Sequence, residues 1–167
     1  MIVFDASTLI LLAKAELLET LLANVRQQVV IPKEVERECS GAKRSLDALL
    51  IQKAINEERI RCLLVRNKKL CAEIQRDFPV GRGEAEALSL AVEEKADIVA
   101  IDDRHGINAC KLLRLPFVTA ISLLVAMVAK GWLGKEEALR KLAALQAYGR
   151  YRAEIVNDAR LQLEGKK

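Results

Sequence analysis

The sequence predicts a three-layer α/β fold, in which helices cover both faces of a parallel sheet of roughly five strands. Short apolar runs alternate with amphipathic segments along all 167 residues, and this alternation is typical of such folds. The apolar runs are continuous, as in strands that are buried on both faces. Because no linker, repeat or low-complexity stretch interrupts the pattern, we expect one domain over residues 1–167.

Local signals place the individual elements. Ser7 or Thr8 is a suitable N-cap for the first helix, Pro32 suits the first position of the second, and residues 79–83 form the clearest turn. The predicted strands are 1–4, 29–31, 60–65, 98–101 and 117–119. The predicted helices are 9–22, 32–40, 46–55, 68–76, 84–94, 107–113, 121–130 and a helix pair from 135 to about 163.

Composition limits the function classes. The chain has 27 Lys and Arg residues against 23 Asp and Glu residues, and its net charge of +4 is compatible with a polyanionic partner. Only 4% of the residues are aromatic, which argues against an aromatic platform for stacking the bases of single strands. The cysteines at 39, 62, 71 and 110 lack C-x-x-C spacing, so we interpret them as small core residues in a reducing compartment.

The location of the protein is expected to be cytoplasmic. Residues 1–4 lead directly into an aspartate, without the basic region or cleavage site of a secretory signal. The longest apolar stretch, from Leu115 to Ala129, is too short and too interrupted to span a bilayer. We therefore expect no membrane partner.

Two aspartates directly follow predicted strands. Asp5 ends the first strand, and the pair Asp102-Asp103 ends the fourth. Open parallel sheets bind ligands outside the carboxyl ends of their strands, at the point where the strand order reverses. Either aspartate alone is also typical of a helix N-cap or a turn, but two in one sheet predict a shared acidic crevice.

Glu84 is a third acid of interest. On a helical wheel it lies in the middle of the apolar stripe that contains Leu88 and Ala91, whereas Glu86 lies nearly opposite and is expected on a solvated face. A carboxylate on the core side of a helix costs on the order of several kcal/mol unless it is paired, coordinated or protonated. A capping acid that interacts with the helix dipole is the alternative interpretation of Glu84.

The chemistry of these acids indicates a metal. Glu36 and Glu38 flank the core side of their helix at about equal angles, so the wheel does not choose between them. Three or four carboxylates cannot all stay ionised near one another without a cation. Oxygen ligands without His or Cys suit Mg²⁺ or Mn²⁺, which neutralise phosphate oxygens and activate water. The residues therefore predict metal-assisted hydrolysis of phosphodiesters.

Four motifs in order resemble the PIN-domain nuclease superfamily, and together they run nearly the length of the chain. They are Val3-Phe-Asp-Ala-Ser7, Val30-Ile-Pro-Lys-Glu-Val-Glu-Arg-Glu38, Gly83-Glu-Ala-Glu-Ala87 and Ile98-Val-Ala-Ile-Asp-Asp103. The later run through Leu112, Val118 and Lys130-Gly131 resembles an uncharacterised prokaryotic and archaeal branch, which is related to toxin–antitoxin ribonucleases.

The resemblance implies a parallel five-stranded sheet, a Mg²⁺ or Mn²⁺ site, and cleavage of single-stranded RNA or other nucleic acid. It assigns catalytic roles to four acids and selects Glu38 over Glu36; the four are Asp5, Glu38, Glu84 and Asp102. It assigns the metal to Asp5, Glu84 and Asp102, and gives Asp103 a second-metal or supporting role. Ser7 supports Asp5, and Glu86 is a lesser candidate.

The resemblance also implies partners. PIN nucleases commonly form homodimers, and many are blocked by an antitoxin-like protein. The segments Ile121–Ala129 and Leu9–Leu22 are candidate dimer surfaces, although burial in the core is the stronger interpretation of both. The branch usually carries a basic residue where this chain has Ile107, so we expect Arg104 or His105 to replace its phosphate contact, or the contact to be weaker.

Basic residues are expected around the crevice, because they fall near predicted carboxyl-end loops and helix starts. Cations placed there hold the phosphate backbone, while an ordinary charged surface is the alternative for each one. The candidates for nucleic-acid contact are Arg37, Lys43, Arg44, Arg82 and Arg104, with Lys68 and Lys69 nearby.

Two other functions stay open beside a Mg²⁺/Mn²⁺-dependent endoribonuclease-like hydrolase. The first is a non-catalytic PIN module that binds nucleic acid or a partner protein. The second is a phosphohydrolase in which Asp5 attacks phosphorus. Such enzymes usually need a second aspartate two residues later, and Ser7 stands at that position. We therefore rank the phosphohydrolase below the nuclease.

Overall fold

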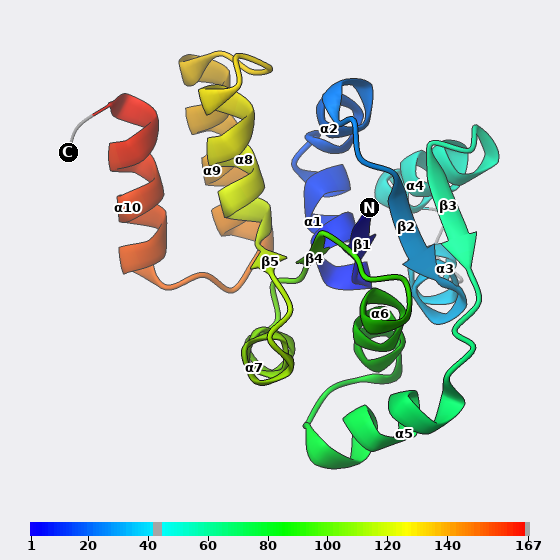
Figure 1. The fold of residues 1–167 in the computed structure, drawn as a ribbon. Coiled ribbons are helices and arrows are strands. Elements are labelled where there is room, and N and C mark those ends of the chain that lie inside the picture. Colours follow the sequence, from blue (N-terminus) through cyan, green and yellow to red (C-terminus); the bar gives the residue numbers. More distant parts are fainter. Residues whose placement is uncertain (42–44, 166–167) are drawn as a thin grey trace.

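The computed structural model describes residues 1–41 and 45–165, which form ten helices around a five-stranded sheet (Figure 1). The strands are β1 (Ile2–Phe4), β2 (Val29–Pro32), β3 (Ile60–Leu63), β4 (Ile98–Ala100) and β5 (Phe117–Val118). The helices are α1 (Ala6–Lys14), α2 (Leu18–Asn24), α3 (Lys33–Ser40), α4 (Leu46–Asn56), α5 (Lys68–Asp77), α6 (Arg82–Glu93), α7 (Arg104–Leu113), α8 (Ala120–Ala129), α9 (Lys135–Tyr148) and α10 (Ala153–Glu164). Within the described ranges, no helix is long and apolar enough to cross a membrane.

The sheet reverses its strand order between β1 and β4. Its order is β3-β2-β1-β4-β5, and every neighbouring pair is parallel. The chain builds outward from β1 through β2 to β3, then returns to add β4 and β5 on the other side of β1. At the reversal the backbone N–H of Asp5 donates to the carbonyl oxygen of Ala100, at 3.0 Å. The edge where this kind of sheet binds ligands therefore lies beside Asp5.

Two apolar cores cover the two faces of the sheet. Successive side chains of a strand point to opposite faces, so Ile2 and Phe4 join one core while Val3 joins the other. The first core includes side chains of α1, α2, α4, α8, α9 and α10, and the second includes those of α5, α6 and α7. Figure 1 shows α5, α6 and α7 together on one side of the strands and α8, α9 and α10 beyond β5. The predicted three-layer fold is confirmed.

The single helix predicted over residues 9–22 is wrong. α1 ends at Lys14, Glu16 adopts a left-handed backbone with φ of 55°, and α2 begins at Leu18. Leu17 and Leu18 on either side of this break are both buried. An apolar helical pattern continues through the break, because both short helices present leucines to the same core, and periodicity alone does not reveal the change of direction.

The packing of α7 against the end of β4 can be tested at Gly106. This glycine is buried, and a methyl group added there would collide with the buried side chain of Ile101. We expect Gly106→Ala to lower the free energy of unfolding by about 1–3 kcal/mol, the usual cost of overpacking a core. Asn108→Ala, at an exposed position of the same helix, is the control and should stay within about 0.5 kcal/mol of wild type. Equal denaturant midpoints for both variants would contradict the tight contact.

Candidate active site

Asp5 is held at the start of α1 by two donors. It is the N-cap of this helix, whereas the sequence analysis assigned the cap to Ser7 or Thr8. Its Oδ1 accepts a hydrogen bond from the backbone N–H of Thr8, at 2.8 Å, and its Oδ2 accepts one from the Ser7 hydroxyl, at 2.5 Å. Asp5 is only 1% exposed. The structure thus places Ser7 against Asp5, as expected of a supporting residue.

Asp102 follows β4 and is held by three donors from three parts of the chain. Its Oδ2 accepts hydrogen bonds from the Thr8 hydroxyl, at 2.8 Å, and from the backbone N–H of Ala120, at 2.9 Å. Its Oδ1 accepts one from the Tyr151 hydroxyl, at 2.5 Å. Thr8 therefore joins the two aspartates, because its N–H binds Asp5 and its hydroxyl binds Asp102. No sequence pattern predicts a role for Thr8 or Tyr151 at Asp102, because these residues lie 94 and 49 positions from it along the chain.

Both aspartates have raised pKa values. The pKa of Asp5 is raised to about 7. Burial is the main cause, the hydrogen bonds from Ser7 and Thr8 lower the pKa in part, and the charge of Asp102 makes a small contribution that raises it. Burial also raises the pKa of Asp102, although the donors Tyr151, Ala120 and Thr8 lower it. Burial is therefore the main reason why both carboxyl groups resist ionisation.

Glu38 and Glu84 meet at the start of α6. The Oε2 of Glu84 accepts a hydrogen bond from the backbone N–H of Gly81, at 2.7 Å, which is the capping contact of the alternative interpretation. The Oε1 of Glu38 accepts one from the backbone N–H of Gly83, at 3.2 Å. Burial, followed by the charges of Asp103 and Glu38, raises the pKa of Glu84 despite the Gly81 hydrogen bond. These acids therefore interact electrostatically.

Gly83 and Asp103 complete this group. Any side chain at Gly83 would collide with the Glu38 carboxylate, so the absence of a Cβ lets an acid of α3 reach the first turn of α6. Asp103 is the N-cap of α7, and its Oδ1 accepts from the backbone N–H groups of His105, at 2.7 Å, and Gly106, at 3.3 Å. Three helices, α1, α6 and α7, begin beside these acids and direct the positive ends of their dipoles at them.

The donor chemistry of the acids fits a hard divalent cation. The five acids are Asp5, Glu38, Glu84, Asp102 and Asp103, and within residues 1–41 and 45–165 none of them forms an ion pair. Carboxylates are the ligands that Mg²⁺ and Mn²⁺ prefer. Carboxyl groups that lie together without a neighbouring cation are expected to have raised pKa values. Among the described side chains, however, no three His, Cys, Asp or Glu residues are arranged to hold one ion together.

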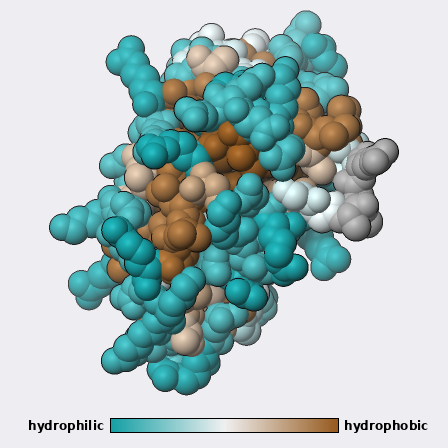
Figure 2. All heavy atoms as spheres, turned by 90° about the vertical axis from the view of Figure 1, so that its right-hand side faces the viewer, coloured by the Kyte–Doolittle hydropathy of each residue, from teal (hydrophilic) through white to brown (hydrophobic). Residues whose placement is uncertain are grey.

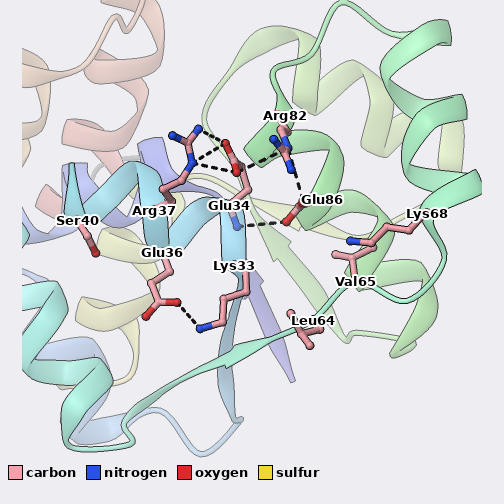
Figure 3. Close-up of a pocket in the computed structure, with 10 residues that line it drawn as sticks. All are labelled: Lys33, Glu34, Glu36, Arg37, Ser40, Leu64, Val65, Lys68, Arg82 and Glu86. Atoms are coloured by element: carbon pink, nitrogen blue, oxygen red, sulfur yellow. Dashed lines mark hydrogen bonds and ion pairs between the residues drawn. The ribbon is translucent and has the colours of Figure 1, made fainter. Parts of the chain in front are cut away.

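Glu86 is buried, which corrects the prediction of a solvated face. It is 7% exposed, because the sheet, α3 and α5 surround α6 and leave it no broad solvent face. Its Oε2 accepts a hydrogen bond from the backbone N–H of Glu34, at 3.2 Å. The Nε of Arg82 lies 3.6 Å from a carboxylate oxygen of Glu34 and 3.8 Å from one of Glu86. Figure 3 shows this network between α3 and α6.

A pocket of about 540 Å³ contains this network (Figure 3). Its lining residues come from α3, the segment after β3, and α5 and α6: Lys33, Glu34, Glu36, Arg37, Ser40, Leu64, Val65, Lys68, Arg82 and Glu86. Lys33 pairs with Glu36, at 2.7 Å, and Arg37 pairs with Glu34. The charges of Glu34 and Glu86 also contribute to the raised pKa of Glu38, so the pocket adjoins the acidic group.

The predicted nucleic-acid contacts lie in different places. Arg37 and Arg82 line the pocket together. Arg104 is exposed at the first position of α7, beyond the N-cap Asp103. Lys43 and Arg44 lie outside the described residues. Lys68 was named only as a neighbour, yet it lines the pocket with the two arginines.

Asp5 makes a testable contribution to stability. Its pKa in the folded chain is about 7 against a usual value of 3.8, so folding favours its protonated form. This stabilisation is complete below about pH 4 and is lost as the pH rises through 7. In metal-free buffer, Asp5→Asn should therefore remove this pH dependence and raise the free energy of unfolding at pH 8 by up to about 4 kcal/mol.

The measurement is urea unfolding from pH 4 to 8. Asp158→Asn, which changes an exposed acid of α10, is the matched control and should keep the wild-type pH dependence. If Asp5→Asn also kept the wild-type dependence, the Asp5 carboxyl would not be the group that titrates.

The comparisons with known proteins agree with the geometry. No curated protein and no solved structure is significantly similar to the chain. Residues 1–166 match the family described as PIN domain, whose members are generally nucleases that use divalent metal ions. The match covers β1 to β5, the strand-end aspartates and the glutamates of α3 and α6. Together with the parallel sheet, this match shows that the chain belongs to the PIN domain family.

Proposed function

We propose that this protein is a metal-dependent nuclease that hydrolyses the phosphodiester bonds of single-stranded RNA. The observation that carries the proposal is the pair Asp5 and Asp102 at the reversal of strand order. Both carboxyl groups have raised pKa values, and neither has a cationic partner among the described residues. Membership of the PIN domain family supports nuclease chemistry at this position.

The residues that would hold Mg²⁺ or Mn²⁺ are the acids that interact there. Asp5, Glu84 and Asp102 are the proposed ligands. The charges of Asp103 and Glu38 act on Glu84, and Glu38 accepts a hydrogen bond from Gly83 in the first turn of α6. A bound ion of this kind supplies charge neutralisation at phosphate oxygens and a more acidic water. Ser7 and Thr8 orient the two aspartates through the hydrogen bonds described above, which is the role of groups that hold metal ligands from behind.

The pocket of Figure 3 is the proposed path for the RNA backbone. It adjoins Glu38, and its cations Lys33, Arg37, Lys68 and Arg82 come from three helices. Lys68 forms no ion pair within the described ranges, so its charge is available for a phosphate. Arg37 and Arg82 extend from the buried acids toward solvent with side chains 74% and 67% exposed. Cations beside an acidic centre hold the backbone that the acids would repel.

The protein partners stay predictions. The apolar side chains of α8 are largely buried in the chain's own core, as are most of those of α1 and α2, so the candidate dimer surfaces are occupied. Three exposed leucines lie on the β3 side of the molecule, namely Leu46, Leu49 and Leu64, while two others, Leu112 and Leu161, lie on α7 and α10. Figure 2 views the β3 side and shows hydrophobic surface between hydrophilic regions. A homodimer or an antitoxin-like protein would have to use surfaces of this kind.

A non-catalytic binding module is the second candidate. The observation in its favour is that the described side chains form no ready three-ligand group, while Asp102 already accepts three hydrogen bonds. A phosphohydrolase that uses Asp5 as nucleophile is less well supported. Such enzymes usually need a second aspartate two residues later, and Ser7 stands at that position and donates to Asp5.

Cleavage of a labelled single-stranded RNA separates the first two candidates. With Mn²⁺ or Mg²⁺ present, wild type should cleave this RNA. Asp5→Asn and Asp102→Asn should each reduce the cleavage rate by about 100-fold or more, because each variant loses the negative charge of a proposed metal ligand and with it the stabilisation of the transition state. Asp158→Asn is the control and should cleave at the wild-type rate. Isothermal titration with Mn²⁺ accompanies the assay. RNA binding without cleavage or metal binding would instead favour the non-catalytic module.

The backbone path is tested by salt dependence. Without divalent ions, RNA affinity should fall steeply with salt, and Lys68→Gln should reduce the slope of log affinity against log salt by about 0.7, the value for one single-strand phosphate contact. Lys53→Gln, a change on α4 at the opposite face of the sheet, should leave the slope unchanged. Fluorescence anisotropy measures both. An unchanged slope in Lys68→Gln would place the backbone elsewhere.

A further inference from the structure

Tyr151 connects the C-terminal helices to the acidic site. It lies in the short connection between α9 and α10, 49 residues after Asp102, and its hydroxyl donates to Oδ1 of that aspartate at 2.5 Å. In Figure 1 this connection lies at the same end of the molecule as the start of α8, whose Ala120 N–H also donates to Asp102. A segment far along the chain thus completes the environment of a strand-end acid.

The connection is shaped around the tyrosine ring. The ring is partly buried and packs against the core that contains α1, α8 and α9. A side chain at Gly149 would collide both with the Tyr151 ring and with the carbonyl oxygen of Leu145. Glycine at this position therefore lets the backbone pass close enough for the hydroxyl to reach Asp102. The hydrogen bond depends on this close packing as well as on the tyrosine itself.

The hydrogen bonds of Asp102 leave one oxygen only partly occupied. An ionised carboxylate offers about four acceptor positions, two on each oxygen. Thr8 and Ala120 use both positions of Oδ2, whereas Tyr151 uses one position of Oδ1. The donor on Oδ1 opposes rotation of the carboxylate and leaves a single acceptor position free. Hydrogen bonds that hold a ligand in this way prepare it for a metal ion.

We propose that Tyr151 is a positioning residue, whose hydroxyl keeps the Asp102 carboxylate in the orientation in which Oδ1 binds a divalent cation. The same contact couples the placement of α9 and α10 to the acidic site. This role rests on the proposed nuclease function, and it assigns to the C-terminal segment a part that no motif of the chain indicates.

The first test is the affinity for Mn²⁺ of Tyr151→Phe, which removes the hydroxyl and keeps the ring in its packing. Loss of a group that orients a ligand typically lowers metal affinity or activity by about 10–100-fold, and we expect both Mn²⁺ binding and RNA cleavage to fall by this factor. Tyr148→Phe is the matched control, because Tyr148 is the only other tyrosine, is 56% exposed on α9 and packs beside Lys14. It should behave as wild type.

The second test reads the site without cleavage. In a Tyr148→Phe background labelled with 3-fluorotyrosine, the chain has one fluorine signal, which belongs to Tyr151. Saturating Mg²⁺ should shift this signal, and the additional change Asp102→Asn should abolish the shift. A tyrosine that serves packing alone would keep the same signal with and without Mg²⁺. This measurement also decides the matter if Tyr151→Phe fails to fold, which circular dichroism and thermal melting reveal.

The outcomes separate the two proposals. Wild type that binds Mn²⁺ and cleaves RNA, with Tyr151→Phe impaired and Tyr148→Phe normal, supports the positioning role. Wild-type values in a folded Tyr151→Phe overturn that role while the nuclease function stands. An unmoved fluorine signal in protein that does bind Mg²⁺ overturns it as well. If wild type neither binds Mn²⁺ nor cleaves RNA, the nuclease function fails, and the role of Tyr151 in it fails too.

Discussion

The link through Thr8 between two strand-end carboxyl groups, the buried Asp5 and the partly buried Asp102, is the constraint on which the rest of the site depends. Parallel strands with a reversal between β1 and β4 bring the two residues together from positions 97 residues apart in the chain. Burial disfavours the charged forms of both residues and raises their pKa values, and the charge of Asp102 adds to the effect at Asp5. The surrounding chain supplies hydrogen-bond donors for both but no cation among the residues described. This imbalance of charge is what makes metal chemistry at the site a physical expectation.

Thr8 holds the two aspartates beside each other. Its backbone N–H and its hydroxyl each donate to a different aspartate, so one fully buried residue fixes the distance and orientation of both. The N-terminal ends of α1, α6 and α7 add favourable dipoles. Glu38 and Glu84 approach at Gly83, where the absence of a Cβ leaves the Glu38 carboxylate in its present position. The acids thus lie close together because helix starts and a bare backbone, rather than ion pairs, accommodate them.

In the second charged region the acids are paired with cations. In the pocket of Figure 3, the carboxylates of Glu34, Glu36 and Glu86 each lie near a lysine or arginine. An arginine in such a pair can exchange its carboxylate partner for a phosphate, since both are bidentate acceptors for arginine. An unpaired acidic group thus lies beside a paired, cation-rich pocket, and the proposed nuclease function rests on this arrangement of charge.

The sequence by itself determined the parallel three-layer fold and the strand-end acids, because continuous apolar runs and the residues that follow them are local features. It also placed Glu84 at a helix start and Glu38 near the site through family resemblance. Only the tertiary structure decided that Glu86 is buried, because neighbours on three sides of α6 cannot be read from one helix, and that the apolar segment 9–22 breaks at Glu16. The contact between Tyr151 and Asp102 was also decided only by the tertiary structure. It joins residues far apart in the chain, so no local spacing encodes it. Its geometry depends on how α9 and α10 pack against the rest of the fold.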